Sequence, residues 1–132
     1  MILLLSAVSK SFAQTTNKVS VENGIIALMY HRFDENKYPS TNIRTKIFLK
    51  PIEEINKTNS KFIDFKEFEQ ILETSIDRNY ILLTIDDAFS SFYENAWPIL
   101  KNKKIPFILF VSTQEIGKHG YMSWKQIKEI EK

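Results

Sequence analysis

The sequence predicts an α/β fold built on a parallel sheet. Three runs, at residues 25–30, 80–85 and 106–111, are apolar along almost their whole length, which is typical of strands buried on both faces. Between these runs, apolar residues recur at three- and four-residue intervals, as expected of helices that cover a sheet. In such folds the loops after the C-terminal ends of the strands carry the functional residues. A site is therefore expected in those loops.

Size and composition favour one globular domain. The chain has 132 residues, of which 43% are hydrophobic and 26% charged, and its 10 Phe, 5 Tyr and 2 Trp can fill a core. This composition excludes disorder and low complexity. A net charge of +2 is too small for a nucleic-acid-binding face, so no nucleic acid partner is expected. The absence of cysteine excludes disulfides, thiolate metal sites and a cysteine nucleophile.

The N-terminus has the pattern of a signal peptide. Residues 2–8 form a short run of apolar and small residues, and Ser11 and Ala13 occupy the two positions that a signal peptidase inspects. Cleavage before Gln14 would place the protein outside the cytoplasm, in the periplasm or the medium. The run is too short to span a bilayer, and the alternative is a first buried strand. The predicted order is a signal peptide at 1–13, a linker at 14–23 and the domain at 24–132.

The domain begins with a strand and a long loop. The run at residues 25–30 predicts a strand that ends near His31. Residues 32–42 contain Pro39 and several Asp, Asn, Ser and Thr residues without an apolar period. That composition predicts a surface loop at the C-terminal end of the strand.

Two helices are predicted next. Apolar residues between positions 47 and 55 indicate a helix of modest quality, in which Pro51 predicts a break or a late start. Asp64 is a residue type that caps helices, and apolar residues follow it at helical spacing. We expect this second helix to use Phe65, Phe68, Ile71, Leu72 and Ile76 as its apolar face.

The second half of the chain predicts two strands and two helices. The run at 80–85 is a strand that ends in an acidic pair, and the helix after it should be kinked or divided by Pro98. The run at 106–111 is the third strand, because proline is acceptable at the first residue of a strand. A last helix is predicted to begin at the N-cap Ser123.

The acidic pair, Asp86 and Asp87, is the most informative feature of the sequence. Two neighbouring carboxylates at the edge of a sheet repel each other unless a cation or a proton is shared. The pair therefore predicts a positive group nearby. In the alternative interpretation, Asp87 caps the following helix and Asp86 is solvated.

The surroundings of the pair match a known family in order and spacing. Residues 84–88 read T-I-D-D-A, residues 97–100 read W-P-I-L, and residues 105–111 read I-P-F-I-L-F-V. These motifs resemble the polysaccharide deacetylases of the NodB-homology family, carbohydrate esterase family four. The resemblance implies the N-terminal portion of a distorted (β/α) barrel, incomplete because a closed barrel needs roughly 200 residues or more. Segments similar to further parts of some bacterial members are 28–32, 38–42 and 122–124.

The resemblance implies distinct roles for the two aspartates, with Asp86 as catalytic base and Asp87 as metal ligand. In the family's complete site, one carboxylate and two histidines hold a divalent metal, which we expect to be zinc. The metal polarises the acetamide oxygen of the substrate and activates a water molecule. The family's H-S/T-x-x-H motif, which supplies both histidines, does not occur in the 132 residues. Ala88 stands where the family commonly has glycine, which is acceptable only if its φ is negative.

Three residues are candidates to line the substrate cleft: His31, Arg32 and Asn42. His31 lies at the end of the first strand and is equally well explained as a hydrogen-bonded strand end. The second histidine, His119, lies between two glycines and is expected to be a solvated loop residue. Neither histidine has a partner at the four-residue spacing that places two imidazoles on one element.

The implied activity is hydrolysis of N-acetyl, less often O-acetyl, groups of an amino-sugar polysaccharide. The chain is expected to be a gene fragment, a truncated form or a remnant, inactive by itself, which another chain could complete. One rival is a non-catalytic remnant that binds carbohydrate through aromatic residues of the loops. A second rival is a receiver-like signalling domain, in which an acidic pair after a strand binds magnesium.

Overall fold

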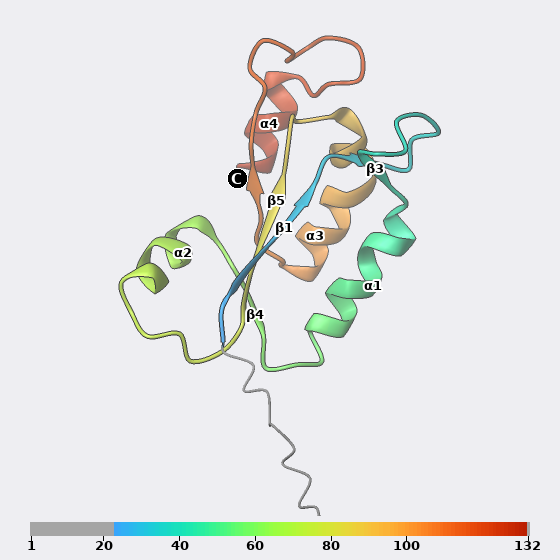
Figure 1. Ribbon diagram of the computed structural model, residues 1–132. Coiled ribbons are helices and arrows are strands. Elements are labelled where there is room, and N and C mark those ends of the chain that lie inside the picture. The colour runs from blue at the N-terminus through green and yellow to red at the C-terminus, as the bar shows by residue number, and fades with distance from the viewer. Residues whose placement is uncertain (1–22, 132) are drawn as a thin grey trace, which may run out of the picture.

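The computed structural model describes residues 23–131, and a parallel sheet organises them around one central strand (Figure 1). This strand, β5 (Tyr80–Ile85), pairs along its whole length with β1 (Ile25–Tyr30). Its other edge is shared by β4 (Lys61–Ile63) and β6 (Ile108–Leu109). All three pairings are parallel, which confirms the predicted α/β class. The predicted signal peptide and all but the last residue of the predicted linker lie outside the described residues.

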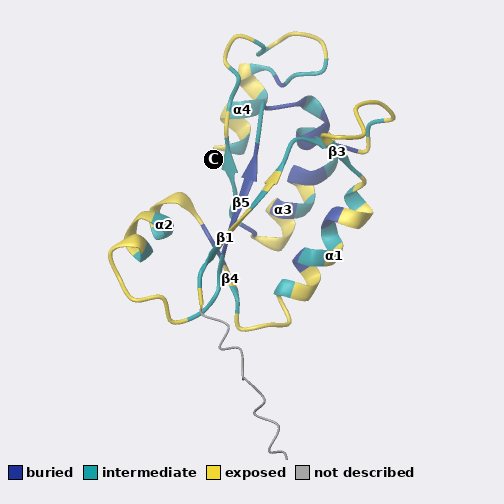
Figure 2. Cartoon of the chain, viewed as in Figure 1, coloured by how far each residue is buried: buried dark blue, intermediate teal, exposed yellow. Residues whose placement is uncertain are grey.

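The two long strands differ in burial, although their sequences are equally apolar. Every residue of β5 after Tyr80 is buried, whereas in β1 the side chains of Ile26 and Met29 are 48% and 62% exposed (Figure 2). The expectation that the first strand is buried on both faces is therefore wrong for the described residues. Within this part of the chain β1 also pairs with β5 on one edge only, which leaves its other edge unpaired.

Three short strands depart from the sequence prediction. The third predicted strand, 106–111, is reduced to the two residues of β6. Strand β4 was not predicted. Within the predicted loop at 32–42, β2 (Arg32–Phe33) pairs in parallel with β3 (Asn42–Ile43). Such short strands carry too few residues for an apolar period to be visible in the sequence.

The first two helices agree with the prediction in position but differ in extent. Helix α1 (Thr45–Ile55) continues through Pro51, so the predicted break or late start is wrong. Its buried residues Phe48 and Ile52 lie on both sides of the proline, and their packing outweighs the hydrogen bond that proline cannot donate. Helix α2 (Phe65–Leu72) begins at the predicted cap Asp64 through a capping box but stops before Ile76, which is 39% exposed.

The helices of the second half follow the prediction closely. A π-helical turn, η1 (Phe92–Ala96), leads into α3 (Trp97–Lys103), and Pro98 lies in the first turn of α3, where its missing N–H is harmless. The helical residues run without interruption from 90 to 103, and the departure from α-helical geometry is the π-helical turn just before the proline, where the sequence predicts a kink or a division. Helix α4 (Trp124–Ile130) begins at the predicted N-cap Ser123, which forms a capping box with Gln126.

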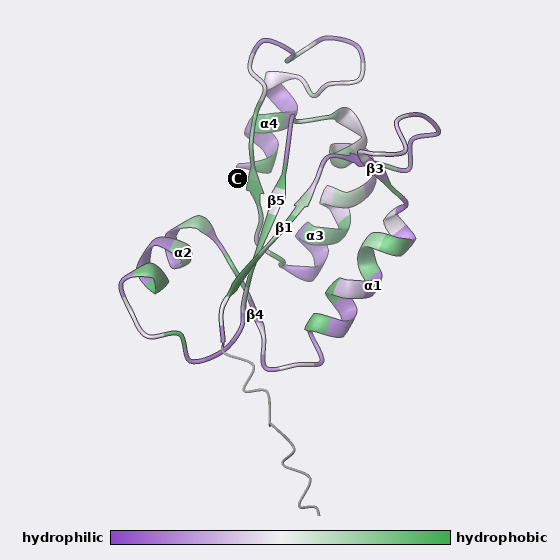
Figure 3. Ribbon diagram, viewed as in Figure 1, coloured by the Kyte–Doolittle hydropathy of each residue, from purple (hydrophilic) through white to green (hydrophobic). Residues whose placement is uncertain are grey.

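Aromatic side chains join the loop after β1 to the helices. The Phe33 ring lies 5.0 Å from Phe48 of α1 and 5.7 Å from Phe92 of η1, and all three side chains are fully buried. Hydrophobic residues also occur on α2 (Figure 3), yet none of its residues is buried. Within residues 23–131, no helix has the length and apolar character needed to cross a membrane.

Candidate active site

Three loops gather at the C-terminal end of the sheet, at the top of Figure 1. They are the segment after β1 at 31–44, the segment after β5 at 86–91 and the segment after β6 at 110–122. Backbone hydrogen bonds join the last two, from Ser90 N to Gly120 O (3.0 Å) and from Met122 N to Ala88 O (2.9 Å). This is the end of a parallel sheet at which functional residues are expected.

Asp86 is held at the end of β5 with one carboxylate oxygen unpaired. Its backbone N–H donates to the Tyr30 carbonyl (2.8 Å), which continues the pairing with β1 by one residue. Its Oδ2 lies 3.9 Å from His31 Nε2, and the two side chains are only 26% and 23% exposed. Its Oδ1 is buried and has no hydrogen-bond partner among the described residues. A buried carboxylate oxygen without a donor is costly, so this atom marks a place for a donor or a cation.

Asp87 is held in a different way, through backbone conformation and a serine. Its φ of 69° lies in the left-handed region, which asparagine and aspartate tolerate better than most residues. The Ser112 hydroxyl, just beyond β6, donates a hydrogen bond of 2.7 Å to Asp87 Oδ1. Ser112 had no signal in the sequence, because its importance depends on the pairing of β5 with β6.

Ala88 also adopts the left-handed region, with φ 56°. The expectation of a negative φ at this position is therefore wrong. The residue is fully buried, and its carbonyl accepts the hydrogen bond from Met122, so the surrounding loop fixes its conformation. This is a position where glycine would carry no steric strain.

The capping interpretation of the acidic pair finds no support in these contacts. The N-cap residue of the π-helical turn η1 is Ser91, which makes no side-chain cap hydrogen bond, and the Asp87 carboxylate bonds to Ser112 instead. Asp86 is largely shielded from solvent rather than freely solvated.

The three cleft candidates separate into two places. His31 and Asn42 line a hollow of about 200 Å³ at the end of β1, beside Tyr30, where partial burial raises the pKa of the phenol. The Asn42 amide is engaged, because it accepts from Glu35 N and donates to Glu35 O, each at 2.9 Å. In the described structure, these two hydrogen bonds of Asn42 hold together the two ends of the loop between β2 and β3.

Arg32 lines a second hollow, and its guanidinium contacts two aromatic rings and a carboxylate. Its guanidinium carbon lies 3.5 Å from the centroid of the Phe89 ring and 4.2 Å from that of Tyr38. Its Nη1 pairs with Glu35 at 3.0 Å, and Glu35 accepts a hydrogen bond of 2.7 Å from the buried Ser91 hydroxyl. His119 lines the same hollow and is exposed, as predicted.

The described residues do not by themselves form a complete divalent metal centre. A catalytic zinc takes three protein ligands, and within residues 23–131 no group of three or more His, Asp and Glu side chains could hold a metal ion. His31 adjoins Asp86, whereas His119 lies at the other hollow, so the two imidazoles do not meet at the acidic pair.

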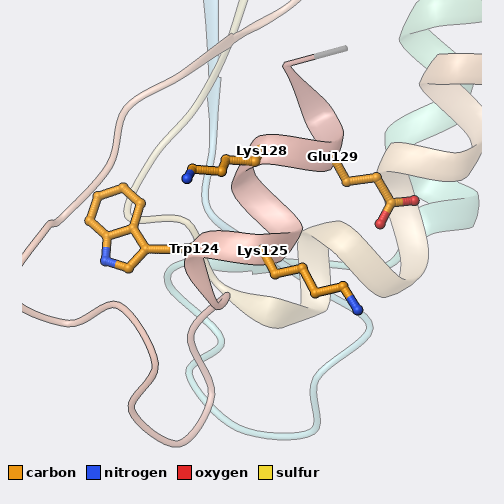
Figure 4. Close-up of a pocket in the computed structure, with 4 residues that line it drawn as sticks. All are labelled: Trp124, Lys125, Lys128 and Glu129. Atoms are coloured by element: carbon orange, nitrogen blue, oxygen red, sulfur yellow. The ribbon is translucent and has the colours of Figure 1, made fainter.

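A further hollow lies apart from the acidic pair, on the surface of α4. It measures about 620 Å³ and is lined by four residues of that one helix. Figure 4 shows Trp124 and Lys128 on one side of the helix and Lys125 and Glu129 on the other. Glu129 accepts a hydrogen bond from Tyr93 (2.8 Å), which raises the pKa of the tyrosine.

Comparison with known proteins finds a family match in the second half of the chain. The family model for polysaccharide deacetylases matches residues 74–132, which include the acidic pair and the segments around β6 and α4. Residues 74–132 are similar to a polysaccharide deacetylase domain. The receiver-like alternative is therefore set aside.

Relatives of known name extend this similarity toward the N-terminus. A poly-beta-1,6-N-acetyl-D-glucosamine N-deacetylase of Staphylococcus aureus is 28% identical over 131 residues, covering 84% of this chain and 45% of the relative. The solved structure of IcaB from Ammonifex degensii is 30% identical, with a TM-score of 0.74, covering 83% of this chain and 48% of that one. Streptococcus pyogenes deacetylase PplD in complex with acetate shares the fold, at 24% identity and a TM-score of 0.69, covering 81% of this chain and 51% of PplD.

These comparisons confirm the predicted fold as the N-terminal portion of the deacetylase barrel. The deacetylase portion described here spans about half the length of the relatives it matches.

Proposed function

We propose that this chain forms part of a metal-dependent deacetylase. The enzyme removes acetyl groups from a β-1,6-linked N-acetylglucosamine polymer. The substrate class is that named for the Staphylococcus aureus relative. The single observation that carries the proposal is the environment of Asp86, a shielded carboxylate beside His31 with one buried oxygen that has no partner.

In the proposed reaction, Asp86 accepts the proton of the attacking water, and Asp87 contributes one carboxylate ligand to the metal. General-base catalysis requires the base within hydrogen-bond reach of that water, and the unpaired Asp86 Oδ1 has no competing donor among the described residues. The hydrogen bond from Ser112 would fix the orientation of the Asp87 carboxylate. The other ligands of the metal are not supplied by residues 23–131.

Export is part of the same proposal. It is supported by the apolar run at residues 2–8 with small residues at 11 and 13, and by a polymeric substrate that is met outside the cytoplasm. A second candidate function is carbohydrate binding without catalysis. It is favoured by the aromatic side chains of Tyr38 and Tyr121, which line a hollow between two of the loops at the C-terminal end of the sheet.

The roles of the two aspartates are separable in a protein of full barrel length. We would join residues 1–132 to the part of Ammonifex degensii IcaB that this chain does not match, and then prepare Asp86→Asn and Asp87→Asn. Both variants are expected to lose acetate release by at least about 100-fold. Asp87→Asn should also lose bound metal, whereas Asp86→Asn should largely keep it.

Metal content and acetate release are measured on the same preparations, with Ser112→Thr as a control that keeps the hydroxyl beside Asp87. Equal metal loss in the two aspartate variants would show that the roles are misassigned. Acetate release that survives Asp86→Asn would favour another base.

A further inference from the structure

A hollow of about 370 Å³ lies between the loop after β1 and the loop after β6. Its size suits one small ring-shaped ligand. Two tyrosines, two basic side chains, a histidine, a carboxylate and a glycine line it: Arg32, Glu35, Lys37, Tyr38, His119, Gly120 and Tyr121.

Residues that line or support the hollow are close to the acidic pair, both in the sequence and in the structure. Arg32 directly follows His31, whose imidazole is 3.9 Å from Asp86. The Phe89 ring beneath Arg32 lies two residues after Asp87. An extended polymer bound at the acidic pair would therefore have neighbouring units within reach of this hollow.

Tyr38 lines the hollow and has a strained backbone conformation. Its φ of 60° is a genuine outlier for a bulky side chain. One side of its ring covers the Arg32 guanidinium, yet the residue remains 53% exposed. Strain of this kind is retained where the surrounding structure holds a residue in place for a function. Here it keeps a flat aromatic surface at the rim.

The charges around the hollow do not balance. Arg32 is paired with Glu35, which leaves Lys37 as the extra positive charge; no ion pair within residues 23–131 involves it. His119 lines the same hollow and is exposed. A cationic ligand is therefore repelled, whereas an uncharged ring with polar substituents is accepted.

We propose that this hollow binds one sugar ring of the polymer against Tyr38 and prefers an N-acetylated unit over a free-amine unit. The proposal rests on the proposed function, because deacetylation converts a neutral sugar into a cationic one. It implies that a unit beside an already deacetylated neighbour is bound less well. Tyr38 and Lys37 are then specificity-determining residues of the same active site.

The test is an NMR titration of the full chain with a β-1,6-linked N-acetylglucosamine pentamer and with its fully deacetylated form. The acetylated pentamer is expected to shift the resonances of Tyr38 and Tyr121, and the deacetylated form should bind about fivefold more weakly. Tyr38→Ala should weaken binding of the acetylated pentamer about fivefold, whereas Tyr38→Phe, which keeps the ring, should not.

Charge variants test the preference separately. Lys37→Glu should bring the affinity for the deacetylated pentamer up to that for the acetylated one. Lys50→Glu is the matched control, because it makes the same charge change at an exposed position of α1 away from the hollow, and it should leave the preference unchanged.

The proposal is overturned if wild-type protein binds neither pentamer, if folded Tyr38→Ala binds like wild type, or if Lys37→Glu keeps the preference. Acetate release by the barrel-length protein is scored independently. Pentamer binding at Tyr38 without acetate release refutes the deacetylase function alone. If Tyr38→Ala changes neither the rate nor the KM of acetate release from the pentamer, the proposed sugar binding in the hollow is refuted and the deacetylase function is not.

Discussion

Two consecutive left-handed residues, Asp87 and Ala88, shape the end of β5. A non-glycine residue in this region costs roughly 1–2 kcal/mol, and alanine has no polar side chain to compensate. The strain is retained because Ala88 is fully buried and its carbonyl is tied to Met122. The turn directs the Asp87 carboxylate to Ser112 rather than to the following helix.

This strain predicts an unequal response to two substitutions at position 88. Ala88→Gly removes about 1 kcal/mol of strain but also loses a buried methyl worth about 0.8 kcal/mol, so stability should change by less than about 1 kcal/mol. Ala88→Val adds bulk to a filled site and a β-branched side chain at positive φ, which should cost about 2 kcal/mol or more. Urea unfolding of the three proteins measures both effects. Similar losses in the two variants would contradict the left-handed assignment.

Among the elements, the helix starts could be predicted from sequence and the short strands could not. Asp64 and Ser123 act locally, because each cap bonds to a backbone N–H three residues away. Strands β4 and β6 exist only because β5 offers them an edge, which is a long-range condition. The acidic pair could be found in the sequence because its motif is local. Ser112 could not, because its contact with Asp87 depends on the long-range pairing of β5 with β6.

The end of α3 provides a prediction at the scale of one element. Lys104 follows the helix with φ 53°, and its N–H bonds back to Leu100 and Lys101 carbonyls. Lys104→Gly should stabilise the protein by about 1 kcal/mol, because glycine adopts this conformation without strain and the side chain is exposed.

Lys103→Gly is the control for that change. It places the same residue one position earlier, inside α3, and should destabilise the protein by about 0.5–1 kcal/mol. Thermal unfolding at one pH distinguishes the two. A loss of stability in Lys104→Gly would mean that the helix does not end in a left-handed residue.

On the scale of the whole molecule, the sheet is open where a barrel would continue. Strand β1 has one partner among the described residues, and the exposed Ile26, Met29 and Phe110 are large apolar side chains beside uncovered strands. Exposed apolar strand edges favour association with another chain or segment. The acidic pair lies at one end of this open sheet, with its ligand set incomplete within residues 23–131.

The most direct measurement is acetate release from the N-acetylglucosamine pentamer in excess zinc, by residues 1–132 alone and by the same residues extended to barrel length. One carboxylate ligand without two imidazoles holds zinc weakly, so the isolated chain is expected to release no acetate above background. The extended protein is expected to release acetate in a zinc-dependent manner. Zinc-dependent turnover by the isolated, folded monomer would contradict the claim that residues 1–132 carry only part of the metal site. No turnover by the folded extended protein would contradict the assignment of Asp86 and Asp87 to a shared metal-dependent site.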